Sequence, residues 1–241
     1  MLKIENLTVQ IQEKIVLKNI NLHIPVGETH ILFGPNGSGK SSLLLTVLGY
    51  PQYKIKKGKI FLKGKDITKL PVDERSQLGM GMLFQTPPMI KGLRLDMLLK
   101  RINPENYETH KRYVDRLDAE GLLPRDINVG FSGGERKRSE LLQLVIQQPD
   151  FVMFDEPESG VDVENMKIIG KVTRELVQGD KIRDRHKSAL IITHTGYILD
   201  YLSADRGYIM LDGELRCKGN PQEMFHNIQK NGFKICAKCY S

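Results

Sequence analysis

The sequence predicts an α/β fold with helices on both faces of a sheet, and two observations carry this prediction. The continuous apolar run at residues 151–154 and the largely apolar segment at residues 188–193 are typical of buried central strands. Helix-like stretches, including 133–147 and 163–177, alternate with these runs along the chain. The chain has 241 residues, of which 40% are apolar, so it is long enough to build a proper core.

The N-terminal region predicts an antiparallel β subdomain. Residues 2–11 and 14–24 both alternate apolar with polar side chains and are separated by only two residues, so they are expected to pair. Residues 58–62 and 64–66 indicate a second antiparallel pair. Further along, residues 93–123 have a helical pattern interrupted by loops. We therefore expect one domain, 1–241, with a small helical subdomain inserted at about 90–148.

The last third of the chain predicts a hairpin and a closing helix. Residues 208–211 and 214–217 read as two strands joined across Asp212-Gly213, and a helix is expected from Pro221 onward. Earlier in the chain, residues 79–85 form an apolar run that ends in a polar residue, which predicts a buried strand. No internal repeat or low-complexity segment interrupts this pattern.

Residues 34–41 have the spacing G-x-x-x-x-G-K-S between a short apolar run and a helix-like run. Glycines let successive backbone amides approach a phosphate at the positive end of a helix. Lys40 is expected to reach the β- and γ-phosphates, and Ser41 to offer its hydroxyl to Mg²⁺. A glycine-rich turn before an ordinary helix is the simpler alternative. The predicted nucleotide-binding residues here are Gly34, Pro35, Asn36, Gly37, Ser38, Gly39, Lys40, Ser41 and Ser42.

Four polar residues follow predicted strands at the edge where α/β sheets bind their ligands. Asp155 and Glu156 come directly after the run 151–154. Asp155 is expected to hold Mg²⁺, and Glu156 to orient or deprotonate an attacking water. Gln85 is a candidate for contacting both the metal and that water, and His194 for contacting the γ-phosphate. Taken singly, Gln85 and His194 could be an ordinary strand end and a surface histidine.

Residues 131–138, Phe-Ser-Gly-Gly-Glu-Arg-Lys-Arg, resemble the signature motif of ATP-binding-cassette ATPases, usually written L-S-G-G-Q. The order of phosphate loop, Gln85, signature, acidic strand end, the D-loop-like residues 159–162 and His194 matches that family over nearly the whole chain. The resemblance implies a P-loop NTPase fold with a RecA-like core, ATP and Mg²⁺ as cofactors, and ATP hydrolysis.

The resemblance also implies an ATP-dependent head-to-tail homodimer. Ser132, Gly133 and Gly134 open a helix, so their amides are expected to form a second anion site that closes on the ATP held by another copy. Glu135 and Asp162 are carried over as further nucleotide-binding residues. The aromatic residue on which family members stack adenine is missing from residues 11–16. Adenine is therefore expected to rest on aliphatic side chains such as Ile11 or Val16.

Residues 129–138, together with 198–201 and 231–233, resemble the SufC-type ATPases of the Suf iron–sulfur assembly system. This resemblance implies soluble SufB/SufD-like scaffold partners. One alternative is the ATPase subunit of a membrane transporter, and another is a regulatory nucleotide-binding module without turnover. DNA-repair members of the family carry long coiled-coil insertions, which a chain of this length excludes.

Composition bears on location and partners. The net charge is +7, but lysines and arginines look scattered, so the excess is interpreted as solvated surface and phosphate sites, with no nucleic-acid partner expected. Three cysteines favour a reducing compartment, and no long apolar run indicates membrane insertion, so a cytoplasmic protein is expected. Cys236 and Cys239 have metal-ligand spacing but supply only two ligands. They are either incidental or shared between two chains.

Overall fold

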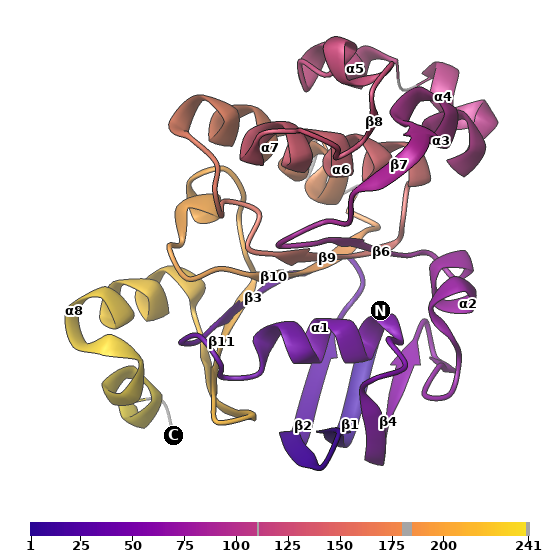
Figure 1. Ribbon diagram of the computed structural model, residues 1–241. Helices are drawn as coiled ribbons and strands as arrows, with labels where there is room; N and C mark the ends of the chain where they lie inside the picture. The colour runs from indigo at the N-terminus through magenta and orange to yellow at the C-terminus, as the bar shows by residue number, and fades with distance from the viewer. Residues whose placement is uncertain (110, 180–184, 240–241) are drawn as a thin grey trace.

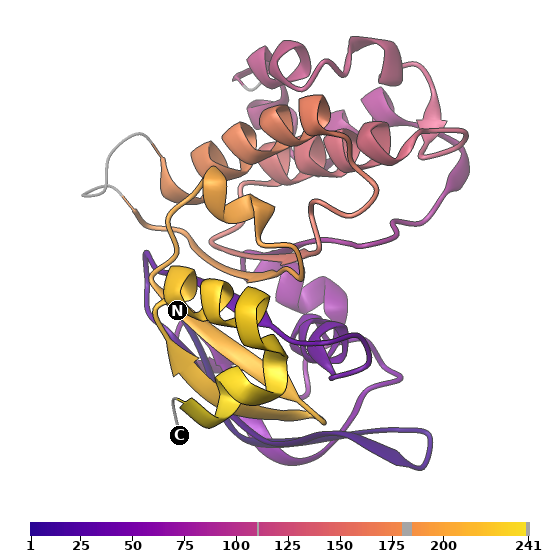
Figure 2. The ribbon, with the colours of Figure 1, turned by 90° about the vertical axis from the view of Figure 1, so that its left-hand side faces the viewer.

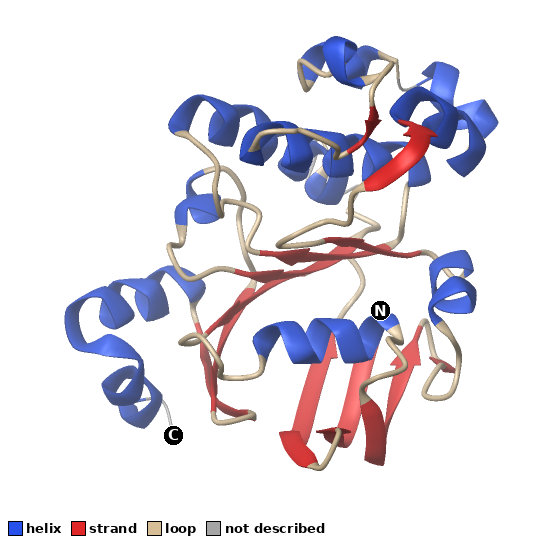
Figure 3. Ribbon diagram, viewed as in Figure 1, coloured by secondary structure: helices blue, strands red, loops and turns tan. Residues whose placement is uncertain are grey.

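The computed structural model describes residues 1–109, 111–179 and 185–239, without the side chains of 106, 108, 109 and 234–239. Its elements lie in levels (Figure 1): helices at the top, a six-stranded sheet beneath them, helix α1 (Lys40–Leu48) under that sheet, and a second sheet at the bottom. Figure 3 separates these levels by colour. The predicted α/β class is therefore confirmed, with helices on both faces of the main sheet.

The lower sheet is antiparallel and has the strand order β2-β1-β4-β5. Its strands are β1 (Leu2–Ile11), β2 (Lys14–Ile24), β4 (Lys54–Leu62) and β5 (Lys65–Asp66). Apolar side chains alternate with polar ones, so one face packs on the core and the other faces solvent. The paired strands predicted near the N-terminus are confirmed.

The main sheet has the order β12-β11-β3-β10-β9-β6, and every neighbouring pair is parallel except β11 with β12. Strands β3, β9 and β10 are buried along their whole length, which explains their continuous apolar sequences. The strands are β3 (Thr29–Phe33), β6 (Met80–Leu83), β9 (Phe151–Asp155), β10 (Ser188–Ile192), β11 (Arg206–Leu211) and β12 (Glu214–Gly219).

Successive side chains of this sheet enter two separate hydrophobic cores. Ile31 packs with the upper helices α6 (Gly133–Gln147) and α7 (Val163–Gln178), whereas its neighbour Leu32 packs with α1 and the antiparallel sheet. Because successive side chains point to opposite faces of the sheet, the same strands pack against the upper helices and against the lower half of the molecule. The carboxyl ends of the strands, where the predicted site residues lie, are held from both faces.

The upper helical region is built from short helices around α6. They are α3 (Leu95–Ile102), α4 (Pro104–Thr109), α5 (Arg112–Arg116) and a 3₁₀ turn at Glu120–Leu122. One part of the prediction is wrong here, because the segment leading into α3 is a strand. β7 (Ile90–Arg94) pairs with the two-residue β8 (Asp126–Ile127), and this ladder ties the start of the helical region to its end.

Helix α2 (Val72–Gln77) carries a buried arginine that caps the end of α1. The guanidinium of Arg75 donates to the carbonyl oxygens of Thr46 and Val47 at 3.0 and 2.8 Å, and also to those of Leu70 and Thr68. Burial lowers the pKa of Arg75 to about 10, so the group stays charged at neutral pH. The last carbonyls of α1 are thereby satisfied by a cation, as the helix dipole favours.

The chain closes with a 3₁₀ turn at Tyr197–Asp200 and helix α8 (Pro221–Cys239), which bends at Gly232. Figure 2 shows α8 in the foreground, in front of the β11–β12 hairpin. Its Phe225 stacks on Phe33 of β3, with ring centroids 6.0 Å apart. In the part of the chain that the structure describes, no helix is both long and apolar enough to cross a membrane.

Candidate functional site

The loop between β3 and α1 forms a cradle of backbone amides. Gly37 and Gly39 adopt positive φ values of 77° and 109°, which glycine accommodates without strain. A Cβ at Gly34 would lie 2.5 Å from the carbonyl oxygen of Met210, so only glycine fits there. The buried Ser38 hydroxyl has no hydrogen-bond partner among the described residues. The loop therefore presents unsatisfied donors, as a phosphate site requires.

Lys40 lies in this loop with its charge held by backbone carbonyls. Its Nζ donates to the carbonyl oxygens of Gly34 at 2.7 Å and Pro35 at 3.0 Å, and only 5% of the residue is exposed. Burial lowers the pKa of Lys40, while Glu156 and Asp155 act in the opposite direction. Both carbonyl partners are neutral, so the cation can turn to an anion that enters the loop.

The acidic strand end meets the loop at Ser41. The Ser41 hydroxyl donates to Oδ1 of Asp155 at 3.2 Å, and burial raises the pKa of that carboxyl. Gln85 lies just past β6, and its Nε2 donates to Oε2 of Glu156 at 2.8 Å. His194 Nδ1 lies 3.3 Å from Oε1 of the same carboxylate. The structure thus brings together Ser41, Asp155, Glu156, Gln85 and His194, although they come from separate segments of the chain.

Glu156 has an unusual backbone conformation for its residue type. Its φ is +50°, and its amide donates to the carbonyl oxygen of Ile192 on the neighbouring strand at 3.1 Å. Left-handed conformations of residues other than glycine are uncommon and cluster at functional sites. This turn directs the Glu156 carboxylate to Gln85 and His194 and away from the strand direction.

A cavity of about 530 Å³ opens beside these residues. Phosphate-loop residues line one side together with Gln85 and Glu156, while Ile15 and Val16 of β2 line another. Val16, one of the two aliphatic side chains predicted to support adenine, thus lines this cavity, whereas Ile11 is not among the lining residues. Ser132, Gly133 and Gly134 are not among the lining residues.

The β11–β12 turn is a part of this cavity that the sequence alone did not reveal. Gly213 donates its N–H to the carbonyl oxygen of Ser38 at 2.9 Å and accepts from Lys18 N at 2.8 Å. A Cβ at Gly213 would lie 2.4 Å from the carbonyl oxygen of Val16. The C-terminal hairpin thus fastens the phosphate loop to β2. The Asp-Gly pair signalled a turn, but nothing in the sequence placed that turn beside residue 38.

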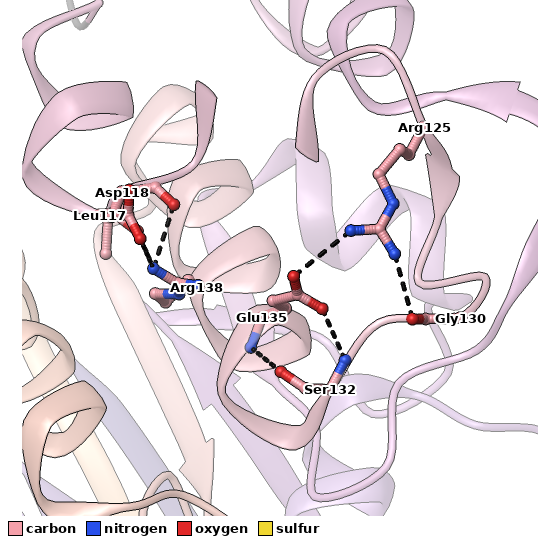
Figure 4. A network of polar contacts seen from close by, with 7 residues as sticks. All are labelled: Leu117, Asp118, Arg125, Gly130, Ser132, Glu135 and Arg138. Atoms are coloured by element: carbon pink, nitrogen blue, oxygen red, sulfur yellow. Dashed lines mark hydrogen bonds and ion pairs between the residues drawn. The ribbon is translucent and has the colours of Figure 1, made fainter. Parts of the chain in front are cut away.

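The signature segment begins α6 with a reciprocal cap (Figure 4). The Ser132 hydroxyl accepts from Glu135 N at 3.2 Å, and the Glu135 carboxylate accepts from Ser132 N at 2.7 Å. Arg125 Nη1 lies 3.3 Å from Glu135 and Nη2 donates to the carbonyl oxygen of Gly130. These donors, the Ser132 amide first, lower the pKa of Glu135. The S-x-x-E spacing is the capping-box pattern and could have revealed this role.

The start of α6 packs against the loop that follows Glu156. A Cβ at Gly133 would lie 2.2 Å from the carbonyl oxygen of Gly160, and one at Gly134 would lie 2.7 Å from Asn165. Asp162 caps α7, because its Oδ1 accepts from Asn165 N at 2.9 Å. Glycine is therefore required at position 133, where the backbone of residue 160 approaches, whereas a side chain at position 134 would displace that of Asn165. The signature and the D-loop-like segment form one surface.

Two side chains of α6 hold the segment that carries Gln85. Lys137 Nζ donates to the carbonyl oxygens of Phe84 and Gln85, the latter at 3.1 Å, and Glu140 Oε1 accepts from Phe84 N at 3.3 Å. Burial lowers the pKa of Lys137 and raises that of Glu140 to about 8. Lys137 lies within the signature-like residues 131–138, but that motif predicted no such role for it, and no pattern singled out Glu140. A helix that begins at the signature therefore positions Gln85.

A cysteine metal site gains no support. No cluster of three or more histidine, cysteine, aspartate or glutamate residues suited to a metal exists among the described residues. The side chains of Cys236 and Cys239 lie outside the described part of the chain. Cys217, within β12, is buried.

The geometry is that of a nucleotide-binding P-loop site, and comparisons with known proteins narrow the class. A family profile described as ABC transporter matches residues 17–159. The probable ATP-dependent transporter ycf16 of Cyanidium caldarium is 39% identical over 248 residues, covering 97% of this chain and 95% of that protein. The probable ATP-dependent transporter SufC of Escherichia coli K12 is 34% identical, covering 97% of each.

Solved structures agree with the sequence comparisons. A nucleotide-free ATP-binding cassette from an ABC transporter matches with a TM-score of 0.77 at 25% identity, covering 96% of this chain and 95% of that one. The chain belongs to the ABC transporter family of ATP-binding cassettes, and it is an ATPase. Its relatives include SufC, as the signature residues predicted.

Proposed function

We propose that this ATPase drives a SufB/SufD-like scaffold protein in iron–sulfur cluster assembly. The observation that carries the proposal is the 34% identity to SufC, which extends over 97% of both chains and so includes the regions outside the nucleotide motifs. Residues 1–241 would act as one cassette domain, with the region 90–148 as its helical subdomain, in the cytoplasm. ATP-driven closing and opening of a dimer of this chain would supply the work done on the scaffold.

The residues at the acidic strand end suit Mg²⁺ as a cofactor for ATP. The Ser41 hydroxyl and the Asp155 carboxylate converge, and Gln85 donates through its nitrogen, which leaves its amide oxygen as an acceptor. Oxygen donors of this kind are those that Mg²⁺ prefers. When bound, Mg²⁺ would neutralise charge on the phosphate oxygens. Ser41, Asp155 and Gln85 would hold it, while Lys40 and the loop amides grip the triphosphate.

Glu156 would orient the water that attacks the γ-phosphate. Its carboxylate is fixed through one oxygen by Gln85 and lies beside His194 through the other. A fixed carboxylate can accept a proton from water and direct its lone pair, which is the positioning that phosphoryl transfer requires. His194 is exposed enough to reach an incoming phosphate. Gln85 and His194 would therefore report the presence of the γ-phosphate to Glu156.

The signature would complete this site in a second copy of the chain. The cap uses the amides of Ser132 and Glu135, but the first-turn amides of Gly133 and Gly134 have no partner within the helix. The Ser132 hydroxyl accepts a bond, so its own hydrogen is free to donate. These groups would form an anion site for ATP held by the other copy. The D-loop-like residues beside them, including Asp162, would meet the partner in the same step.

Replacing Glu156 by glutamine tests the hydrolytic role. Glu156→Gln is expected to reduce ATP turnover by about 10²–10⁴-fold, because the general base is lost, while ATP binding and ATP-dependent dimerisation persist. Turnover is measured by phosphate release, and dimerisation by light scattering with Mg-ATP. The exposed Glu223→Gln is the control. Unchanged turnover in Glu156→Gln would refute the assigned role.

The scaffold proposal is tested by affinity capture. The Glu156→Gln form, loaded with ATP, serves as the bait in an extract of the cells that make this protein, and the proteins it retains are identified. We expect soluble SufB/SufD-like proteins, identified by mass spectrometry, and faster phosphate release when they are added back to the wild-type chain. The second candidate is a transporter subunit, favoured by the names of the relatives. If the only protein recovered is an integral membrane protein that requires detergent, the transporter alternative is established and the scaffold proposal is overturned.

A further inference from the structure

The positive charge of this chain is concentrated in one segment. Residues 54–69 contain seven lysines and one aspartate, a net charge of +6, whereas the whole chain carries +7. The expectation that cations are scattered therefore fails for this stretch. It spans β4 and β5 at the edge of the antiparallel sheet, and all seven lysines are exposed.

The same segment borders a groove of about 740 Å³, away from the nucleotide cavity. The groove lies between β4, the C-terminal end of α1 and the start of α2. Lys56, Lys57 and Lys69 line it, and no ion pair joins any of them to another described residue. Asp73 also lines it, while the charge of Arg75 is committed to four backbone carbonyls. The groove thus has free cations on its rim.

The groove also contains an open strand edge. β5 pairs with β4 only at Phe61 and Leu62, whereas residues 54–59 of β4 pair with β1 on one side. Among the described residues, no strand pairs with residues 54–59 on the other side. Ile55, Tyr53 and Val72 add apolar surface to the lining. Backbone groups, apolar contacts and lysines are therefore offered together over a length of about 20 Å.

We propose that this groove binds an extended acidic polypeptide segment of a partner protein, which adds as a strand to the open edge of β4. Main-chain hydrogen bonds to residues 54–59 supply affinity, and carboxylates of the ligand pair with Lys56, Lys57 and Lys69. Alternate side chains of an extended ligand face opposite ways, so acidic residues can meet the lysines while apolar residues meet Tyr53 and Val72.

Three simpler roles for the lysines account for fewer of these features. Exposed lysines can protect a strand edge from aggregation, but that role needs neither a groove nor an apolar lining. Nucleic-acid sites favour arginine for its forked contacts, and residues 54–69 contain none. A membrane surface is flat, whereas this surface is hollowed. A polypeptide uses all the features that the groove presents.

Fluorescence anisotropy with the whole chain tests the proposal. The probe is a labelled eight-residue peptide of alternating glutamate and valine, about 27 Å long when extended. We expect saturable binding that weakens at least tenfold in Lys56→Glu/Lys57→Glu/Lys69→Glu. The variant Lys167→Glu/Lys171→Glu/Lys230→Glu makes the same charge change at exposed sites elsewhere and should weaken binding less than twofold. Melting temperatures and ATP affinity confirm that both variants fold.

A second peptide, N-methylated at every residue, keeps the side-chain charge but has no main-chain N–H to donate. It should bind at least tenfold more weakly, and equal binding would overturn strand addition.

Equal weakening by both triple variants would show that only net charge matters. Tighter groove-dependent binding of an eight-nucleotide oligouridylate, or of phosphatidylglycerol vesicles, would replace the proposal by a nucleic-acid or membrane surface. No peptide binding would overturn the proposal and leave only edge protection. ATP turnover is independent of each outcome, so the proposed function stands or falls separately.

Discussion

Helices α1 and α6 both begin at glycine-rich segments, but their N-termini are capped differently. α1 begins after Gly39 with no side-chain cap and no acidic residue in its first turn. α6 begins after Ser132 with a complete capping box and an acidic residue at Glu135. The first-turn amides of α1 therefore remain as donors for an external anion, whereas some of those at the start of α6 are already hydrogen-bonded to its own side chains. The N-terminus of α1 thus keeps its donors available for a ligand, whereas the N-terminus of α6 is ordered by its own side chains.

The α1 terminus gives the largest expected effect in this comparison. Lys40→Ala removes the cation that would leave Gly34 and Pro35 for the phosphates, so ATP affinity should fall by about 10–100-fold. Isothermal titration with Mg-ATP measures this loss, and the exposed Lys171→Ala serves as the control. Wild-type affinity in Lys40→Ala would show that the amide cradle alone holds the nucleotide.

The α6 terminus is expected to affect turnover instead of binding. Gly133→Ala places a methyl group against the carbonyl oxygen of Gly160, which is backbone and cannot simply rotate away. We expect ATP turnover to fall at least tenfold with little change in ATP affinity of the single chain, and a stability cost of about 1–3 kcal/mol. Gly121→Ala, where a Cβ meets nothing within 4 Å, is the matched control. An equal loss in Gly121→Ala would point to a general effect of the substitution.

Further along α6, Glu140 provides a pH test of how the helix holds Gln85. Burial raises the pKa of Glu140 to about 8, so the folded state keeps a proton that the unfolded state releases above its ordinary pKa of 4.5. Stability contributed at this residue therefore decreases as pH rises between those values. Glu140→Gln should gain on the order of 1–2 kcal/mol relative to the wild type between pH 5 and pH 8. The melting temperatures of the two proteins are measured across this pH range. A constant difference between them would contradict the raised pKa of Glu140.

The smallest expected effect concerns the cap itself. Glu135→Ala removes the carboxylate that accepts from Ser132 N, at a cost of about 1 kcal/mol, or about 2–4 °C in Tm. Glu135→Gln should retain most of this stability, since glutamine also completes a capping box. The glutamine usual in the family would therefore serve the same local role. If both variants melt alike, the loss comes from the Arg125 ion pair and not from the cap.

Much of the site could be predicted because its residues have local signatures. The phosphate loop and the acids at the carboxyl end of β9 are each contiguous and adjoin strong apolar runs, so spacing alone placed them. Gly213 and Lys137 could not be found in this way, because their roles depend on contacts with Ser38 and Gln85, which lie far away in the sequence. The ladder of β7 with β8 was missed for a related reason: a two-residue strand has no periodicity to detect.

The position of β3 in its sheet has a consequence for how the protein is made. β3 lies between β10 and β11, whose residues are translated more than 150 positions after it. On the ribosome, the strand that leads into the phosphate loop must therefore wait without either neighbour until residues 188–211 have emerged. The fastening of residue 38 by residue 213 comes at the same late stage. A nascent chain should acquire the ability to retain ATP only after residue 213 has emerged.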